Sequence, residues 1–364
     1  MMKIKNFQHT RKSKISGVQK MQSVFKDAKN LRFLSMKVKK LSIIGAGSWG
    51  TTLAILLGEK GYNVSLWTRR EETAKEINTK KENKQYLKDI KIPNTVIATH
   101  SIEDAVKDSN VVVFAVPSSF LREVAKLFSE VINKDTIVIH TVKGIEESTG
   151  KFMSEVLKEE LTKGVNIAVL SGPNHAEEVA NKLPTATVIA SENENISRIL
   201  CKVFVTPYFK PYPHHDVIGV EICSVVKNTV AIAIGICDGL KLGDNAKASI
   251  LTLGLTEMSI IAKHFGAKKA TCYGLAGVGD LITTCYSHHS RNRFVGEMLA
   301  KEKTIEQIKK EMHGMIAEGI KNTKTIYELC KKKGMETPLI SQTYKVLYED
   351  MNLREAIEQL LDMV

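Results

Sequence analysis

The pattern of apolar and polar positions changes character once along the chain. Up to about residue 212, short apolar runs alternate with stretches in which apolar residues recur at helical spacing. The runs predict buried strands and the stretches between them predict helices, an alternation typical of a doubly wound parallel sheet. The predicted strands are residues 41–44, 63–67, 111–116, 136–141, 166–170, 185–190 and a region near 202–208. The predicted helices between them include residues 71–78, 101–107, 119–131 and 148–162.

Beyond residues 212–216 the strand patterns disappear, and helical patterns continue to the C-terminus. We therefore predict an α/β fold, with an N-terminal doubly wound Rossmann-type sheet domain (residues 38–216) followed by an all-α C-terminal domain (residues 217–364). Such sheets bind ligands beyond the carboxyl ends of their strands, so the loops there are candidates for chemistry. The predicted C-terminal helices are residues 217–235, 246–265, 291–299, 304–312, 320–333, 338–348 and 353–363.

The first strand leads into a glycine turn and a helix, in the sequence LSIIGAGSWGTTLAILLGEKG (41–61). Gly45 permits a tight turn, and Gly47 lets the backbone approach a pyrophosphate without a Cβ in the way. Gly50 allows close packing of helix and strand, and the N–H groups at the helix start face the phosphates. Because a second strand follows at the spacing of a βαβ unit, this stretch predicts a dinucleotide site.

The second strand ends without the acidic residue that usually binds the ribose hydroxyls of NAD. The sequence there is Thr68-Arg69-Arg70. A guanidinium group suits a 2′-phosphate, although Arg70 is also readily interpreted as a solvated surface residue. We therefore predict that NADP(H) is used at least as well as NAD(H).

The net charge of +12 is concentrated at the N-terminus. Residues 1–37 hold ten Lys or Arg and one acid, Asp27, so +9 of the +12 lies there. The rest of the chain is nearly balanced, and we expect no nucleic-acid partner. Residues 1–37 form a basic extension with three interpretations: a disordered tail, an organelle transit segment, or translated sequence upstream of a start at Met36. We favour the last of these, or a dispensable tail.

The composition is typical of a globular protein in a reducing compartment. Hydrophobic residues make up 43% of the chain and charged residues 25%, and no apolar run approaches the length of a membrane span. The six cysteines lack paired spacing, which favours free thiols and a cytoplasmic location. The clusters Cys285, His288, His289 and His214, His215 lack a second ligand pair at matching spacing, so we expect no metal site.

One cation stands in the long apolar helix predicted from residue 217. Lys227, with Asn228 beside it, is costly to bury unless it is paired or neutral. Burial and a second nearby cation would lower its pKa and make it a proton acceptor near neutral pH. The alternatives are that Lys227 reaches the surface or only pairs with Glu221.

Three further stretches carry candidate groups. Lys143 follows a predicted central strand and could reach the cleft. Residues 274–280 form a second glycine-rich stretch; because no strand precedes it, we interpret it as a flexible turn that presents Asp280. Ser290 can cap the helix that begins with Arg291 and Asn292, and that helix start suits a phosphate. The features together describe a nicotinamide enzyme whose substrate has a hydroxyl to deprotonate and a phosphate.

The chain resembles the bacterial-type NAD(P)-dependent glycerol-3-phosphate dehydrogenases from about Met36 onward. Seven motifs occur in order: GAGSWGTTLA, VKGIE, LSGPNHAEEVA, GVEICSVVKN, GLAGVGDLITTC, SRNR and AEGIKNT. The resemblance implies oxidation of sn-glycerol 3-phosphate to dihydroxyacetone phosphate or the reverse, for glycerophospholipid synthesis. The chain departs from the family pattern at two places: the N-terminal extension, and Asn174, where many relatives have Ser.

The resemblance also implies roles for individual residues. Lys227 is the proton acceptor, with Lys143 and Asp280 as further catalytic candidates. The implied cofactor residues, beside Gly45, Gly47 and Gly50, are Ser48, Trp49, Arg69, Lys143, Ala176, Arg291, Ile316 and Glu318. The implied substrate residues are Lys143, Gly172, Asn174, Lys227, Asp280, Ser290, Arg291 and Asn292.

Two other functions stay open at this point. The first is a related dehydrogenase acting on ketopantoate or a hydroxy acid, since Arg291 could bind a carboxylate equally well. The second is a nucleotide-sensing protein without turnover. A homodimer is also plausible because the helical domain offers apolar surface.

Overall fold

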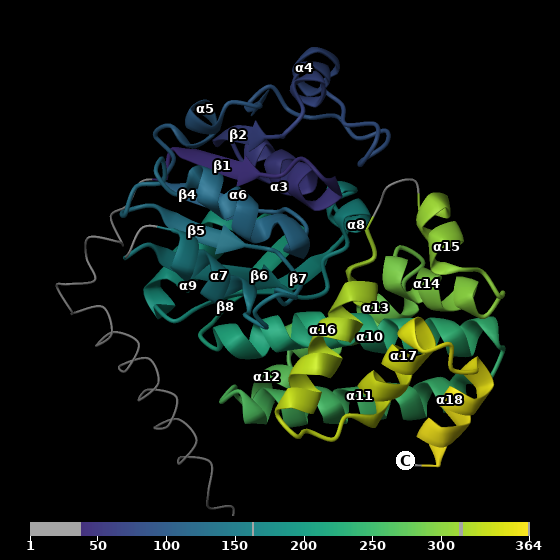
Figure 1. Ribbon diagram of the computed structural model, residues 1–364. Coiled ribbons are helices and arrows are strands. Elements are labelled where there is room, and N and C mark those ends of the chain that lie inside the picture. Colours follow the sequence, from purple (N-terminus) through teal and green to yellow (C-terminus); the bar gives the residue numbers. More distant parts are fainter. Residues whose placement is uncertain (1–37, 162–163, 313–315, 363–364) are drawn as a thin grey trace, which may run out of the picture. The chain divides into compact units, whose positions relative to one another are not determined.

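The computed structural model describes residues 38–161, 164–312 and 316–362. Along the chain, the residues that form the sheet come first and the helical part follows (Figure 1). The eight strands are β1 (Lys40–Ile44), β2 (Asn63–Trp67), β3 (Val96–Thr99), β4 (Val111–Phe114), β5 (Ile137–His140), β6 (Asn166–Ser171), β7 (Thr185–Ser191) and β8 (Phe209–His214). They form one sheet in the order β3-β2-β1-β4-β5-β6-β7-β8. All neighbours are parallel except β6 and β7, so the sheet is mostly parallel with one antiparallel step.

Helices cover the sheet and join its strands. They are α3 (Ser48–Glu59), α4 (Glu71–Lys80), α5 (Ile102–Val106), a 3₁₀ turn η3 (Ser118–Phe120), α6 (Leu121–Phe128), α7 (Met153–Glu160), α8 (Ala176–Ala180) and α9 (Glu194–Phe204). The central strands β1, β4 and β5 are apolar along most of their length and buried on both faces, as a covered parallel sheet requires. Chain order reverses between β1 and β4, which places a ligand-binding crevice at their carboxyl ends.

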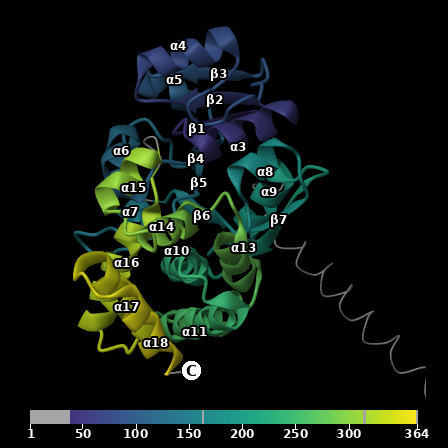
Figure 2. The same cartoon turned by 90° about the vertical axis from the view of Figure 1, so that its right-hand side faces the viewer.

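The C-terminal part is helical throughout its described residues. Its elements are α10 (Val217–Gly239), α11 (Gly243–His264), α12 (Lys269–Cys272), a π-helical turn η4 (Leu275–Gly279), α13 (Asp280–Tyr286), α14 (Arg291–Leu299), α15 (Ile305–Glu311), α16 (Glu318–Lys332), α17 (Pro338–Tyr348) and α18 (Leu353–Leu361). Helix α10 packs against α11, α13, α14 and α16, and Figure 2 shows it among them. Because neighbours cover α10 on nearly every side, its sequence is apolar around the whole circumference.

Helix α10 has the length and hydropathy of a membrane-spanning segment, the one described helix that does. Nearly all of that apolar stretch is buried inside the protein. Its composition is therefore explained by its place in the core.

The fold class is as predicted, but several predicted elements need correction. The region near 202–208 is not a strand: α9 continues to Phe204, and the edge strand β8 follows it. Strand β8 contains Pro211 and Pro213, which an edge strand tolerates and which hide it from pattern analysis. Strand β3 is short and was not predicted. Neither were helices α8, α12 and α13 or most of α9.

Some predicted boundaries also differ. The helix predicted from residue 148 begins at Met153, since Phe152 forms a β-bridge with Ile145. The helix predicted to end at residue 235 runs to Gly239. The predicted basic extension (1–37) and the predicted helix ends at residues 162 and 363 lie outside the described residues. The domain boundary near Asp216 stays a prediction, since residues 38–364 form one compact unit.

Candidate active site

The glycine turn after β1 has the shape of a dinucleotide loop. Gly45 has a φ of +117°, and a Cβ there would lie 2.6 Å from the Ala115 carbonyl oxygen. A Cβ on Gly50 would lie 1.9 Å from the Gly45 carbonyl oxygen, so both positions require glycine. A Cβ on Gly47 would meet no atom within 4 Å. Gly47 therefore faces open space, as an approaching pyrophosphate requires.

The start of α3 is suited to an anion. The helix has no side-chain cap and no acidic residue in its first turn, so the first-turn N–H groups and the positive end of the helix dipole are not already balanced. Gly47 precedes these N–H groups directly. The loop and helix start therefore fit the phosphates of a dinucleotide.

A cavity of about 590 Å³ extends from this loop to the helical part. Most of the residues predicted as site residues line it: Gly45, Gly47, Ser48, Trp49, Arg69, Lys143, Asn174, Ala176, Lys227, Ser290, Arg291, Asn292, Ile316 and Glu318. Gly50, Gly172 and Asp280 do not line it. Gly50 lies beneath the loop, Gly172 has a φ of +136° and packs against Thr187, and Asp280 lies behind the two lysines. The structure thus brings together groups more than 250 residues apart in the chain.

Lys227 is held by two groups of helix α13. Its Nζ lies 2.5 Å from Asp280 Oδ1 and 2.8 Å from Thr284 Oγ1. Thr284 in turn donates to the Asp280 carbonyl oxygen at 2.6 Å. The predicted alternative partner, Glu221, instead accepts hydrogen bonds from Ser154. Lys227 is therefore buried and paired across helices, not exposed at the surface.

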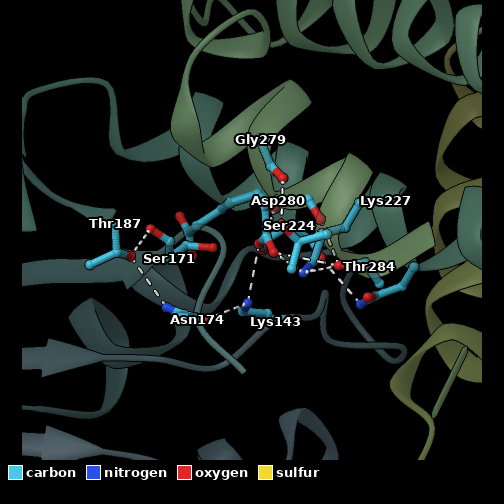
Figure 3. Close-up of polar contacts among 12 residues, drawn as sticks. Lys143, Ser171, Asn174, Thr187, Ser224, Lys227, Gly279, Asp280 and Thr284 are labelled. Atoms are coloured by element: carbon cyan, nitrogen blue, oxygen red, sulfur yellow. Dashed lines mark hydrogen bonds and ion pairs between the residues drawn. The ribbon is translucent and has the colours of Figure 1, made fainter. Parts of the chain in front are cut away.

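Asp280 joins the two lysines of the site (Figure 3). Its Oδ2 accepts from Lys143 Nζ at 3.2 Å, and Lys143 also donates to Asn174 Oδ1 at 3.1 Å. Asn174 continues to Thr187 at 3.3 Å, which ties this network to strand β7. One buried carboxylate therefore fixes Lys143, from the sheet, and Lys227, from the helical part.

The electrostatics of this triad favour a neutral amine. The pKa of Lys227 is lowered to about 7, chiefly by burial; the Asp280 charge opposes this shift and the Lys143 charge contributes to it. For Asp280, burial alone would raise the pKa, but the charges of Lys143 and Lys227 outweigh it and keep the pKa below its usual value. The site thus contains an ionised carboxylate beside an amine that exchanges its proton near neutral pH.

Asp280 is presented by a helical turn, which corrects the prediction of a flexible loop. Residues Leu275–Gly279 form the π-helical turn η4, and Asp280 begins α13 directly after it. A Cβ on Gly277 would lie 2.0 Å from the Cys272 carbonyl oxygen. The glycine allows α12 and η4 to pack closely and so places Asp280 against α10.

The start of α14 lines the same cavity and is suited to an anion. Ser290 caps the helix by accepting from the Arg293 N–H at 3.2 Å, as predicted, and the first turn contains no acidic residue. Asn292 is used internally: it donates to Asn228 Oδ1 at 2.8 Å and accepts from the Gly319 N–H at 2.9 Å. Arg291 is exposed and lines the cavity.

Two glycines set the distance between this anion site and Lys227. A Cβ on Gly235 of α10 would lie 2.0 Å from the Arg293 carbonyl oxygen. Likewise, a Cβ on Gly296 of α14 would lie 2.0 Å from the Ile232 carbonyl oxygen. Helices α10 and α14 therefore cross in near backbone contact. The crossing carries Arg291 to the same cavity as Lys227.

Several residues in and around the cavity were not predicted from the sequence. Phe120 belongs to η3, which follows the loop after β4; it is 40% exposed and lines the cavity. Ser118 donates through its backbone N–H at 3.1 Å and its hydroxyl at 2.6 Å to Glu318, which joins the sheet part to α16. Thr284 could have been found from its position four residues after Asp280, on the same helix face. His175 and His289 also line the cavity.

Comparisons with known proteins agree with this arrangement. Residues 40–197 match the family model described as NAD-dependent glycerol-3-phosphate dehydrogenase N-terminus, and residues 216–358 match the corresponding C-terminus. A glycerol-3-phosphate dehydrogenase [NAD(P)+] of Chlorobium phaeobacteroides (strain BS1) is 44% identical over 324 residues, covering 88% of this chain and 97% of the relative. One of Clostridium botulinum is 44% identical over 328 residues, covering 89% and 97%.

Solved structures give the same result. The crystal structure of a Coxiella burnetii glycerol-3-phosphate dehydrogenase has a TM-score of 0.85 and 38% identity, covering 89% of this chain and 99% of that one. A ketopantoate reductase from Ralstonia eutropha, at 16% identity and a TM-score of 0.55, is similar in fold alone.

Proposed function

Because the chain belongs to the NAD-dependent glycerol-3-phosphate dehydrogenase family, we propose that it interconverts sn-glycerol 3-phosphate and dihydroxyacetone phosphate, for glycerophospholipid synthesis. The observation that carries this proposal is the buried Lys227 amine on the wall of a cavity that also contains a dinucleotide loop and an anion site. Oxidation of a secondary alcohol that carries a phosphate on the adjacent carbon needs these three features together: a base, a nicotinamide cofactor and a phosphate site.

Lys227 is the proposed proton acceptor. A neutral amine has two N–H bonds and one lone pair. When both N–H bonds donate to Asp280 and Thr284, the lone pair is left for the C2 hydroxyl of a substrate in the cavity. In the reductive direction the ammonium form returns that proton to the carbonyl oxygen. Asp280 holds the amine in place, and Lys143 can donate to a substrate oxygen.

The cofactor is NAD(P), and its nicotinamide accepts or donates the hydride when bound. The glycine loop and the start of α3 would hold its phosphates, and Trp49, Phe120 and Ile316 give the cavity apolar surface for its rings. Ser48, Ala176, Arg291 and Glu318 also belong to the proposed cofactor wall.

The start of α14 is the proposed phosphate site of the substrate. Arg291 and the N–H groups after Ser290 offer charge and hydrogen-bond donors to a phosphate. Asn174 on the cavity wall completes the proposed substrate contacts. Of the other proposed substrate residues, Asn292 supports the site through its bonds to Asn228 and Gly319, and Gly172 supports it by packing against Thr187.

Mixing the purified protein with NADPH and dihydroxyacetone phosphate tests the function directly. Loss of the reduced-cofactor absorbance is expected with this ketone and not with ketopantoate, and the Lys227→Ala variant should abolish it. Faster reduction of ketopantoate, or binding of NADPH without turnover of either ketone, would reject the proposal.

The cofactor preference is a separate proposal. Arg69 and Arg70 both line the cavity at the end of β2, where no acid stands, and Arg70 donates to Gln85 at 2.7 Å. We propose that Arg69 reads the 2′-phosphate, so that NADPH is used at least as well as NADH. Arg69→Gln should raise the KM for NADPH and leave that for NADH unchanged. A strong NADH preference of the wild-type protein would contradict this.

We also propose that the protein is a cytoplasmic homodimer. The described cysteines are free, which supports a reducing compartment. Ile260 on α11 and Ile282 and Tyr286 on α13 are 44–47% exposed, which supports an apolar contact between two copies. Light scattering after size-exclusion chromatography should give twice the chain mass, and Ile260→Glu should shift it toward the monomer. A wild-type monomer would reject the dimer.

A further inference from the structure

Two histidines meet at one edge of the cavity, one from each part of the fold. His175 is the residue directly before α8, in the loop after β6, and His289 directly precedes Ser290 at the start of α14. Their ring centroids lie 6.0 Å apart with the rings tilted by 51°. Both residues line the cavity. The pair therefore joins the sheet loop that carries Asn174 to the helix start that carries Arg291.

The two rings differ in their surroundings. His175 Nε2 is buried and has no hydrogen-bond partner. Burial, together with the charges of Lys227 and Lys143, lowers the pKa of His175 to about 4, so the ring is neutral at pH 7. His289 is exposed, and its backbone N–H donates to Ser287 Oγ at 3.1 Å, which fixes the turn before α14. His175 is thus a partly buried ring, and His289 presents an exposed ring beside it.

The position of His289 points to an anion. The ring stands one residue before the capped start of α14, where no acidic side chain occupies the first turn. Arg291, Lys143 and Lys227 line the same cavity, and the charges of the two lysines act on His175. An imidazole N–H placed among these groups is a hydrogen-bond donor suited to a phosphate oxygen.

We propose that His289 is a further binding residue for the substrate's phosphate and that His175 positions its ring. This inference rests on the proposed function and extends its phosphate site. His289 donates a hydrogen bond in addition to those of the backbone N–H groups of α14. His175 acts only through His289, by holding that ring toward the cavity.

Steady-state kinetics of four variants test this assignment. His289→Ala should raise the KM for dihydroxyacetone phosphate roughly tenfold, the effect of losing one hydrogen bond to a charged group, with kcat and the KM for NADPH unchanged. His175→Ala should raise the same KM severalfold. His175→Phe should restore it, because a phenyl ring still packs against His289. His288→Ala is the matched control, since this exposed neighbour does not line the cavity.

A non-phosphorylated substrate separates phosphate binding from a structural role. With dihydroxyacetone, which lacks the phosphate, wild type and His289→Ala should have the same kcat/KM. Equal losses on both ketones, a fall in kcat, or a higher KM for NADPH alone would overturn the assignment. If the wild-type protein itself does not reduce dihydroxyacetone phosphate, the proposed function fails, and that outcome is distinct from unchanged kinetics of the variants.

Discussion

The two glycine-rich stretches of this chain have similar composition and opposite structures. Residues 45–50 follow a buried strand and turn openly into α3, and Gly47 faces empty space. Residues 274–279 follow the short helix α12 and coil into the π-helical turn η4, where Gly277 is pressed against the Cys272 backbone. The first stretch leaves room for a ligand, whereas the second removes room between two protein segments.

This difference teaches that a glycine's role is set by what precedes it. After a strand the chain must reverse toward a helix, and glycine frees backbone N–H groups for phosphates. After a helix, glycine lets the next turn pack tightly, and here that packing delivers Asp280 to Lys227. We therefore expect the first stretch to contribute to cofactor binding and the second to contribute to proton transfer.

Removing the Lys227 amine, which Asp280 of the second stretch holds, should have the largest effect on activity. Lys227→Ala should lower kcat by roughly 10²–10⁴-fold, the usual contribution of a general base, because it removes the amine proposed to accept the hydroxyl proton. The dissociation constant for NADPH, measured by fluorescence titration, should stay unchanged because the glycine loop is untouched. Turnover within a few-fold of wild type would show that Lys227 is not the base.

Filling the tight contact of the second stretch should have the next largest effect. Gly277→Ala places a Cβ 2.0 Å from the Cys272 carbonyl oxygen, so the backbone must move. We expect a loss of about 1–3 kcal/mol in the free energy of unfolding, and a lower kcat because Asp280 shifts.

The neighbouring glycine provides the control for this variant. A Cβ on Gly279 would have its nearest atom at 3.6 Å, so Gly279→Ala should retain the stability of the wild-type protein. Urea unfolding and kcat, measured on both variants, check the pair. Equal stability of the two would refute the packing argument.

Within the first stretch, Gly47 should respond in the opposite way to Gly277. Gly47→Ala adds a Cβ to open space, so the melting temperature should stay close to that of wild type while the KM for NADPH rises roughly tenfold. Gly50→Ala should instead lower the melting temperature, because its Cβ would lie 1.9 Å from the Gly45 carbonyl oxygen. If Gly47→Ala binds NADPH normally, the loop does not approach the cofactor as proposed.

The same contrast explains how much could be predicted from the sequence. Strand β2 and helices α14 and α17 have the predicted ends, since a strong apolar pattern, the Ser290 cap and Pro338 mark them locally. Strand β8 was missed because two prolines interrupt it at the sheet edge. The ends of an element can thus be predicted where residues within or next to that element determine them.

The partners in the site could not be predicted in this way. The expectation that Lys227 is buried follows from its apolar helix, but its pairing with Asp280 depends on how α10 packs against α13. The turn η4 was wrongly interpreted as flexible because the close contact of Gly277 involves a tertiary neighbour. The predicted roles of individual site residues remain predictions until the variants are measured.

The pH dependence should show the smallest effect and the most specific one. Because burial lowers the pKa of Lys227 to about 7, kcat/KM for glycerol 3-phosphate oxidation should rise with pH through about 7 and then level off. Below that pH the ammonium has no lone pair for the hydroxyl proton. The reduction of dihydroxyacetone phosphate needs the ammonium, so its rate should fall over the same range.

Changing the neighbours of Lys227 should move this midpoint in opposite directions. Lys143→Met removes a positive charge that lowers the pKa of Lys227, so the midpoint should move to higher pH, by about one unit at most. Asp280→Asn removes the negative charge that raises this pKa, so the midpoint should move to lower pH. Lys158→Met, at an exposed ion pair with Glu192, should leave it unchanged. Shifts of the same sign in both site variants would mean that the profile reports another group, and the second glycine stretch would then lose its assigned part in proton transfer.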